Sequence, residues 1–245
     1  LKLVDWTAGG GTHYITDVSV KLADADRSVN NNGLIVNGTV TRTAVATGAD
    51  LVAYSGFSAA NYLEQPYNSD LDFGTGDFSI MGWVTASNSA SWALARQEKG
   101  NNASAGFAIW QNGSTLTGTL YDGVSNTHVT APSVLVSAHW SHFAFIRANG
   151  IATMYLNGVP GTPVATTRNV TNTLAKLLIG VRPAITSPWQ GDLALLRISA
   201  TAPTAEQIAK IYADEKVLFQ ENAQATLYGA SDAVTALAHD PDTDL

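Results

Sequence analysis

Aromatic side chains beside amides and carboxylates are the residues of this chain whose types and spacing suit ligand binding. Aromatic rings stack on the C–H faces of sugars, while a few polar groups fix a ligand's orientation. Trp189 is the strongest candidate, because it lies between Pro188 and Gln190 in loop-like sequence. The ligand-binding residues that we predict on this basis are Trp189, Gln190, Asn112, Asp122, Tyr121 and Trp110. For each ring taken singly, burial in the core is the more common outcome.

The glutamates are too scattered for glycoside hydrolysis. Glycosidases need a pair of carboxylates that project into one cleft, one acting as the acid and the other as the base or nucleophile. No glutamate stands two or four residues from another carboxylate within a predicted strand. The glutamates are Glu64, Glu98, Glu206, Glu215 and Glu221. The sequence therefore favours a protein that is not an enzyme.

Two stretches are rich in the oxygen ligands that calcium prefers. In the first, Asp24, Asp26 and Asn32 are candidate metal ligands, although Asp and Asn also stabilise turns without any metal. Both interpretations stay open there. In the second stretch, residues 70–77, three aspartates precede a predicted buried strand, and we favour turn formation.

The histidines indicate no site. His139 and His142 stand three residues apart, a spacing that places them on opposite faces of a strand rather than together on one metal. His128 is isolated, as are His13 and His239.

The elements that must position these residues are strands, because apolar and polar residues alternate along most of the chain. Asn149-Gly150 and Asn157-Gly158 are strong hairpin signals on either side of the predicted strand 152–156. The other strand-like segments are 51–55, 62–65, 77–84, 92–96, 106–111, 116–121, 142–147, 177–180 and 193–199. Since no helical pattern intervenes, the fold class is all-β: a sandwich, a jelly roll or a barrel.

One segment breaks the alternation after the last predicted strand. Thr204 and Gln207 form a capping-box pattern, and Ile208, Ile211 and Tyr212 follow with the spacing of a helix face. We therefore predict one short helix over 204–212.

Composition excludes several classes of partner. The net charge is −7 and the basic residues are scattered, so nothing in the sequence is suited to nucleic-acid phosphates. No apolar run approaches membrane-spanning length, so we expect no membrane insertion. Cysteine is absent, which favours a bacterial or viral origin over a secreted eukaryotic one.

The order of the motifs resembles the laminin-G-like domains of the concanavalin A-like lectin/glucanase superfamily, of the type found in phage tail fibre and bacterial surface proteins. The segments that carry the resemblance are 26–33, 61–66, 71–83, 140–145 with 154–158, and 191–198 with 204–208. We expect a connecting segment at 1–16, the sandwich at 17–216, and at 217–245 the start of a further module or an oligomerisation region. The chain begins without Met and stops in mid-pattern, so we expect it to be a piece of a longer protein.

The resemblance implies an antiparallel two-sheet jelly-roll sandwich with a helix after the last strand. It also implies binding to host-surface carbohydrate, an extracellular or virion location, and a homo-oligomer such as a homotrimer. Many relatives carry an acidic pair in the last strand, near a calcium ion, where this chain has Ala194 and Leu195. That departure weighs against calcium at Asp26. The alternatives are a structural or oligomerisation module of a fibre and, second, a polysaccharide depolymerase.

Overall fold

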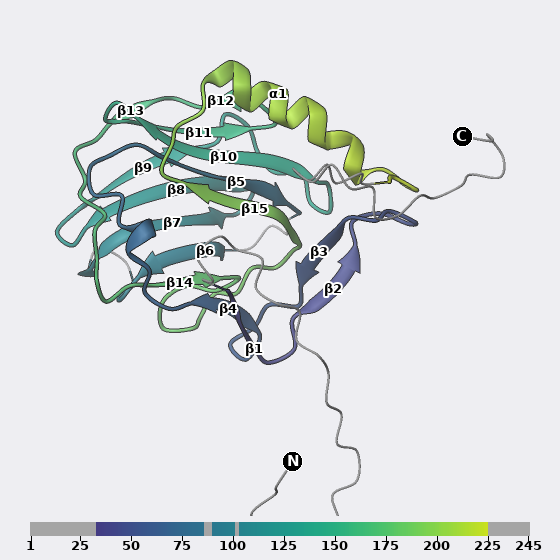
Figure 1. Ribbon diagram of the computed structural model, residues 1–245, viewed down its shortest axis with the longest axis horizontal. Helices are drawn as coiled ribbons and strands as arrows, with labels where there is room; N and C mark the ends of the chain where they lie inside the picture. Colours follow the sequence, from purple (N-terminus) through teal and green to yellow (C-terminus); the bar gives the residue numbers. More distant parts are fainter. Residues whose placement is uncertain (1–32, 86–89, 101–102, 225–245) are drawn as a thin grey trace, which may run out of the picture. The chain divides into compact units, whose positions relative to one another are not determined.

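The computed structural model describes residues 33–85, 90–100 and 103–224, which form two antiparallel sheets packed face to face (Figure 1). The seven-stranded sheet has, in spatial order, β1 (Ile35–Asn37), β4 (Tyr62–Gln65), β14 (Lys176–Ile179), β6 (Ser91–Gln97), β7 (Ala105–Asn112), β8 (Thr115–Asp122) and β9 (Asn126–Thr130). The eight-stranded sheet has β12 (Val159–Pro160), β11 (Ile151–Leu156), β10 (Ser141–Ala148), β5 (Phe78–Val84), β15 (Leu193–Ser199), β3 (Val52–Ser55) and β2 (Thr41–Ala44), with β13 (Val164–Ala165) beside β11. The all-β sandwich prediction is confirmed.

The predicted hairpins form for the expected reason. Asn149 and Gly150 both have positive φ angles, as do Asn157 and Gly158. That backbone geometry belongs to type I′ turns, whose twist matches the strands on either side. The turns join β10 to β11 and β11 to β12, which pair antiparallel.

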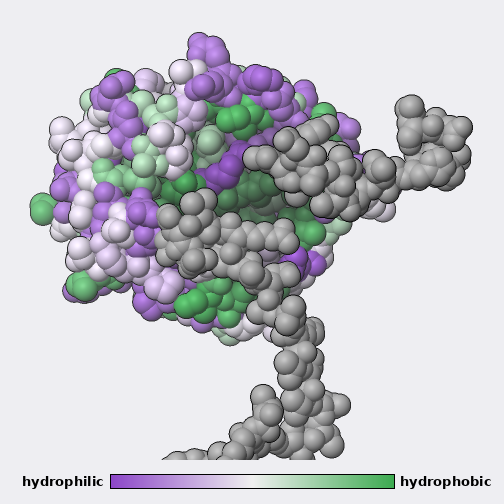
Figure 2. Space-filling view, viewed as in Figure 1, coloured by the Kyte–Doolittle hydropathy of each residue, from purple (hydrophilic) through white to green (hydrophobic). Residues whose placement is uncertain are grey.

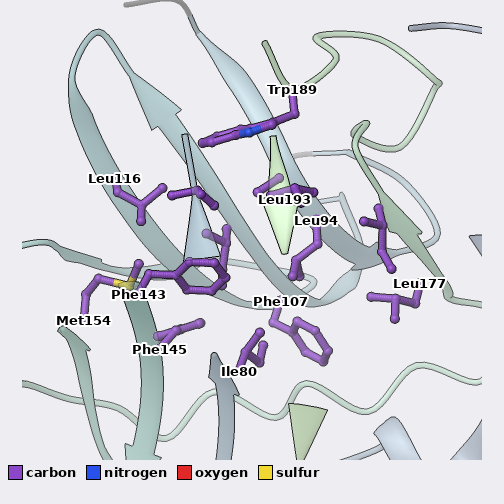
Figure 3. Packing of buried hydrophobic residues seen from close by; sticks show 14 of the residues in the cluster. Ile80, Leu94, Phe107, Leu116, Phe143, Phe145, Met154, Leu177, Trp189 and Leu193 are labelled. Carbon is purple, nitrogen blue, oxygen red and sulfur yellow. The ribbon is translucent and has the colours of Figure 1, made fainter. Parts of the chain in front are cut away.

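A single hydrophobic core fills the space between the sheets, and Figure 3 shows how its side chains interlock. Phe107 and Leu94 come from the seven-stranded sheet, and Ile80 and Phe143 come from the eight-stranded one. The indole of Trp189 closes one end of this cluster and is 1% exposed.

The strand β5 is buried on both faces, which alternation alone does not predict. Its inward residues join the core, while Met81 and Trp83 lie on the outer face, beneath the helix α1 (Ala205–Glu215) and the 3-10 turn η3 (Lys216–Phe219). Ile208 of α1 packs with Met81, and Phe219 stacks on Trp83 with ring centroids 4.2 Å apart. Figure 1 shows α1 lying along the outside of this sheet.

The helix prediction is confirmed with its cap. Thr204 accepts a hydrogen bond from the backbone N–H of Gln207, and the Gln207 side chain accepts one from the backbone N–H of Thr204. Among the described residues, no helix is long and apolar enough to cross a membrane.

A buried arginine fastens the loops at one end of the sandwich. Arg147 at the end of β10 is fully buried and donates to the backbone carbonyls of Gly74, Gly76 and Arg168 over distances of 2.6–2.8 Å. Because three carbonyl oxygens solvate the guanidinium, the charge is tolerated without a carboxylate partner.

Five strands and one boundary contact add to the sequence-based prediction. We did not predict β1, β2, β9, β12 or β13, all short strands at or near sheet edges. Phe219, which lies beyond the expected domain end at residue 216, packs on the sandwich through Trp83 and Trp140. The chain divides into two compact units, Leu1–Gly33 and Leu34–Leu245, and most of the first lies outside the described residues.

Candidate functional site

The outer face of the seven-stranded sheet carries a row of small side chains between taller ones. Ala95, Ala108, Thr119 and His128 stand opposite one another on β6, β7, β8 and β9. The first three are fully buried by their neighbours, and only His128, at the end of the row, is exposed. This register leaves space for large side chains of adjacent rows to lean over the small ones.

Two tryptophans flank this row. Trp92 and Trp110 are cross-strand partners on β6 and β7, with ring centroids 6.0 Å apart and an interplanar angle of 20°. The guanidinium of Arg182 lies 5.2 Å from the centre of the Trp92 ring, so Trp92 is covered. Trp110 is half-buried, which leaves part of its indole open to solvent.

A chain of hydrogen bonds links Trp110 to His128 through Thr119. The Trp110 Nε1 donates to Thr119 Oγ1 over 2.9 Å, and Thr119 Oγ1 lies 2.8 Å from His128 Nδ1. The indole and imidazole rings meet edge to face, with centroids 6.1 Å apart.

Thr119 lies at the centre of these contacts. An indole N–H only donates, so Thr119 must accept from Trp110. Thr119 is fully buried and also shares a hydrogen bond with Tyr121, so its hydroxyl can donate either to Tyr121 or to His128 Nδ1. The tautomer of His128 follows from which of the two accepts. Partial burial lowers the pKa of this imidazole, which favours the neutral ring.

The predicted residues of the β7–β8 hairpin do not form one site. Asn112 is exposed at the hairpin turn, whereas Asp122 lies at the other end of β8, so the length of the strand separates these two predicted ligand-binding residues. Asp122 accepts from the backbone N–H groups of Ser125 and Val124 and pairs with Arg168 at 2.6 Å. These contacts lower the pKa of Asp122 to about 2 and commit its carboxylate to the turn. Tyr121 shares the face of Trp110 but is buried.

Trp189, the strongest candidate from the sequence, is buried, which is the more common outcome for a single ring. Its ring lies in the core, and its Nε1 donates to the backbone carbonyl of Thr85 over 3.1 Å. Stacking of this indole on a ligand is therefore blocked by its own packing. Its neighbour Gln190 is exposed and lines two adjoining hollows.

These two hollows, which together we call the recess, share Gln190, Gly191 and Asp192. The larger has a volume of about 390 Å³ and the smaller about 250 Å³. The half-buried ring of Trp140 lines the larger one, together with Thr43, Ala53 and Ser137 among others. Figure 2 shows a hollow with hydrophobic residues inside it and hydrophilic residues on its rim, on the side of the molecule where β3 and β15 lie in Figure 1.

Carboxylates are placed poorly for hydrolysis on the seven-stranded sheet. Its described strands contain Glu64 on β4 and Asp122 on β8. Glu64 pairs with Lys176 at 2.8 Å, and Asp122 pairs with Arg168. The strands β4 and β8 are four positions apart in the sheet, roughly 19 Å at the usual strand spacing. A glycosidase pair stands within about 10 Å.

The predicted metal ligands Asp24, Asp26 and Asn32 lie outside the described residues. Within the part of the chain that the structure describes, no group of three or more His, Cys, Asp or Glu residues could hold a metal ion. Asp72, for which we favoured turn formation over calcium, accepts from Arg96, Asn172 and Tyr67. Its carboxylate thus links three separate segments of the sandwich.

Sequence reasoning missed Thr119, His128 and Trp140. The first two become a pair only through the register of β8 with β9, and β9 was not predicted. Trp140 belongs to the segment 140–145, which the sequence marks only as part of the family resemblance. The signal that could have identified it is its position just before β10, in the same kind of loop sequence that drew attention to Trp189.

Comparison with protein families gives one match. A family model described as "Concanavalin A-like lectin/glucanases superfamily" matches residues 57–209, well over half of the chain. No curated protein matches the sequence.

Solved structures share the fold at low sequence identity. The binding domain of Paraclostridial Mosquitocidal Protein 1 is 17% identical with a TM-score of 0.60, over 78% of this chain and 49% of that one. The binding domain of botulinum neurotoxin serotype G is 12% identical with a TM-score of 0.61, over 78% and 48%. The matched region thus spans about half the length of these toxin domains.

A third structure is matched over most of its length. Domain 4 of AbnA, an extracellular arabinanase of Geobacillus stearothermophilus in complex with arabinotriose, is 19% identical with a TM-score of 0.58. The match covers 76% of this chain and 91% of that domain.

Proposed function

Because this chain belongs to the concanavalin A-like lectin/glucanase superfamily, we propose that it is a non-catalytic module that binds neutral saccharides on the outer face of its seven-stranded sheet. The observation that carries the proposal is the hydrogen-bonded chain from Trp110 through Thr119 to His128. It holds a half-buried indole and an exposed imidazole in one fixed arrangement.

The chemistry of this arrangement suits a sugar ring. The apolar C–H face of a sugar packs on the open part of the Trp110 indole, and a sugar hydroxyl, which can donate or accept, bonds to Nε2 of His128. Since Thr119 fixes the imidazole before the ligand arrives, little ordering entropy is lost on binding. The neutral imidazole favours an uncharged ligand over an anionic one.

Binding rather than hydrolysis is supported by the carboxylates. Glu64 and Asp122 are separated on the sheet and each is ion-paired, so neither is poised as an acid or nucleophile toward a sugar beside Trp110. A polysaccharide depolymerase of this chain needs other chemistry.

The biological setting that we propose is a phage tail fibre or a similar surface protein that meets host-surface carbohydrate outside the cell. The binding of arabinotriose in the complex with domain 4 of AbnA, and the naming of the toxin structures as binding domains, support a module of this general kind. The sequence resemblance to phage and bacterial surface domains supports the fibre setting.

A structural role in an oligomer is a second candidate function. The edge strand β1 and the residue before it expose three consecutive apolar side chains, Leu34, Ile35 and Val36, which are 46%, 48% and 58% exposed. An exposed apolar edge strand favours pairing with another chain. A homotrimer joined near this edge would release as monomers when Val36→Lys is introduced, which sedimentation would detect.

The saccharide proposal is tested by binding of the full chain to an array of neutral polysaccharides that includes arabinan. Trp110→Ala and His128→Ala each lower the affinity by at least about tenfold, because a few anchoring residues dominate binding energies. His139→Ala, at an exposed imidazole in the loop before β10, is the matched control and leaves the affinity unchanged. No binding by the wild-type chain, or wild-type affinity in both Trp110→Ala and His128→Ala, would falsify the proposal.

Calcium at Asp24, Asp26 and Asn32 stays a separate proposal. If it binds there, calcium raises the unfolding temperature of the wild-type chain and does not raise that of Asp26→Asn. An equal shift in both proteins would place the ion elsewhere.

A further inference from the structure

The recess runs along one face of β3 and is framed by the loop that leads into β15. Ala53, Ser55 and Phe57 alternate along β3 and just beyond it, and all three line the recess. Gln190, Gly191 and Asp192 form the opposite side. The larger hollow, about 390 Å³, lies at the small end of the range of roughly 300–1,000 Å³ for small-molecule sites.

Among the described residues that line the recess, Asp192 carries the only charged group. Its Oδ2 accepts the Thr85 hydroxyl over 2.6 Å, and its backbone N–H donates to Thr85 Oγ1 over 2.9 Å. These bonds hold the side chain in place, and Oδ1 has no hydrogen-bond partner in the part of the chain that the structure describes. None of the ion pairs among the described residues includes Asp192.

A second acceptor lies beside the first. The Nε2 of Gln190 donates to the backbone carbonyl of Pro188 over 3.2 Å, which engages the amide nitrogen and leaves Oε1 as an acceptor. Gln190 is exposed, so this oxygen is accessible to a ligand.

An aromatic wall completes the larger hollow. The Nε1 of Trp140 donates to the backbone carbonyl of Val45 over 2.9 Å, which fixes the indole, and the ring is only half-buried. A carboxylate, an amide oxygen and an aromatic ring form a lining that attracts a cation and repels an anion. The net charge of −7 acts in the same direction.

We propose that the recess binds the primary ammonium group of an amino sugar. An ammonium has three N–H donors and no acceptor, which matches Asp192 Oδ1 and Gln190 Oε1, while Trp140 contacts the sugar ring. The hydroxyls of Thr43 and Ser137 are then available to the sugar hydroxyls. This site is separate in residues and in ligand charge from the surface around Trp110.

The probes are fully deacetylated chitotriose and its N-acetylated form, which share one backbone and differ in the ammonium groups. Binding to the full chain is measured by titration calorimetry at low salt and about pH 6, where a sugar amine is protonated. The deacetylated trisaccharide binds at least about tenfold more tightly, and added salt weakens it.

Substitutions in the recess test whether Asp192 and Gln190 bind the ammonium group. Asp192→Asn keeps an oxygen for the Thr85 hydroxyl but removes the charge, and it lowers the affinity for the deacetylated probe to that for the acetylated one. Gln190→Ala changes an exposed side chain without risk to folding and lowers the affinity several-fold. Asp214→Asn removes one negative charge from the exposed surface of α1 and is the matched control, with affinity unchanged.

The outcomes separate this proposal from the previous one. Equal affinity for the two probes, no binding of either, or an Asp214→Asn effect as large as that of Asp192→Asn overturns the ammonium site. His128→Ala leaves binding of the deacetylated probe unchanged if the two sites are independent. Loss of neutral polysaccharide binding in His128→Ala alone bears only on the outer face of the sheet.

Discussion

The two sheets carry similar aromatic clusters on their outer faces, but the clusters differ in how much of them is exposed to solvent. On the eight-stranded sheet, Trp83 and His142 lie beneath α1 and η3 and are buried. On the seven-stranded sheet, Trp110 is half-buried and His128 is exposed. The described part of the chain has one α-helix, and it covers only the first cluster. The same residue types therefore serve folding on one face and remain accessible on the other.

The hydrogen bonds follow the same division. Trp83 Nε1 donates to Glu215 of α1 over 2.8 Å, so this indole ties the helix to the sheet. Trp110 Nε1 donates instead within its own sheet, to Thr119. Both nitrogens of His142 lack a hydrogen-bond partner among the described residues, whereas His128 is held by Thr119. The covered imidazole is confined by packing and the open one is positioned by a hydroxyl.

The largest difference between the two clusters is expected when Trp83 and Trp110 are each replaced by alanine. Trp83→Ala lowers the free energy of unfolding by about 3–5 kcal/mol, because it empties a site packed by Phe219 and Tyr212 and removes the hydrogen bond from the indole to Glu215. Trp110→Ala costs about 1–2 kcal/mol, since its ring is half in solvent. Urea unfolding of the two variants measures both values. Equal losses would mean that the open cluster is as structural as the covered one.

The pH dependence of stability tests the comparison at His142, on the covered face. Burial lowers the pKa of this imidazole to about 4, below its ordinary value of 6.5. The unfolded chain therefore binds a proton that the folded chain rejects as the pH falls from 6.5 to 4. Stability is complete above about pH 6.5 and falls by up to about 3 kcal/mol toward pH 4.

The pH effect is checked by urea unfolding at a series of pH values. Glu215, at the end of α1, raises the pKa of His142, and Arg197 of β15 lowers it. Burial is the largest cause of the shift. His142→Phe therefore flattens the profile between pH 6.5 and 4, and His128→Ala flattens it less, because burial lowers the pKa of that imidazole too but covers it less. An unchanged profile in His142→Phe would assign the loss of stability to other groups. Below pH 4, protonation of Asp122 and Asp72 adds a further loss, since the pKa values of both are lowered in the folded chain.

The smallest effect on stability is expected at the exposed imidazole. His128→Ala changes the free energy of unfolding by no more than about 0.5 kcal/mol, as for most surface substitutions. Thr119→Val costs about 1 kcal/mol, because Trp110 Nε1 and His128 Nδ1 both lose a partner. If the surface binds saccharide, Thr119→Val also lowers the affinity although Thr119 itself is buried. Wild-type affinity in Thr119→Val would show that orientation of His128 does not matter.

Sequence patterns predicted where most strands lie along the chain, but not which strands are adjacent in the sheets. Period-two alternation reports which strand residues are buried, so β4, β7, β8 and β10 were predicted to within one or two residues. It does not report which strands are adjacent, and the outer-face site depends on β7, β8 and β9 lying side by side. His128 therefore remained an isolated histidine until register placed it opposite Thr119.

Burial of Trp189 shows the second limit of the sequence. Its flanking Pro188 and Gln190 are typical of an exposed loop, and the loop is on the surface. The indole nevertheless turns inward, because a large ring that reaches the core gains more by burial than by exposure. The direction in which one loop residue turns is decided by the space left between two sheets, which a linear pattern does not contain.

Arg147 and the three loop carbonyls that it binds form a clamp, and this clamp affects which amino-acid substitutions the sandwich tolerates. Its three partners are carbonyl oxygens of the backbone, and every amino acid supplies such an oxygen. The side chain at Arg168 can therefore be exchanged without loss of that particular bond, provided the path of the loop is kept. The recess, by contrast, depends on the side chains of Asp192 and Thr85. The clamp therefore constrains the path of the loops more than the identity of their side chains, except at Gly74, whose positive φ favours glycine.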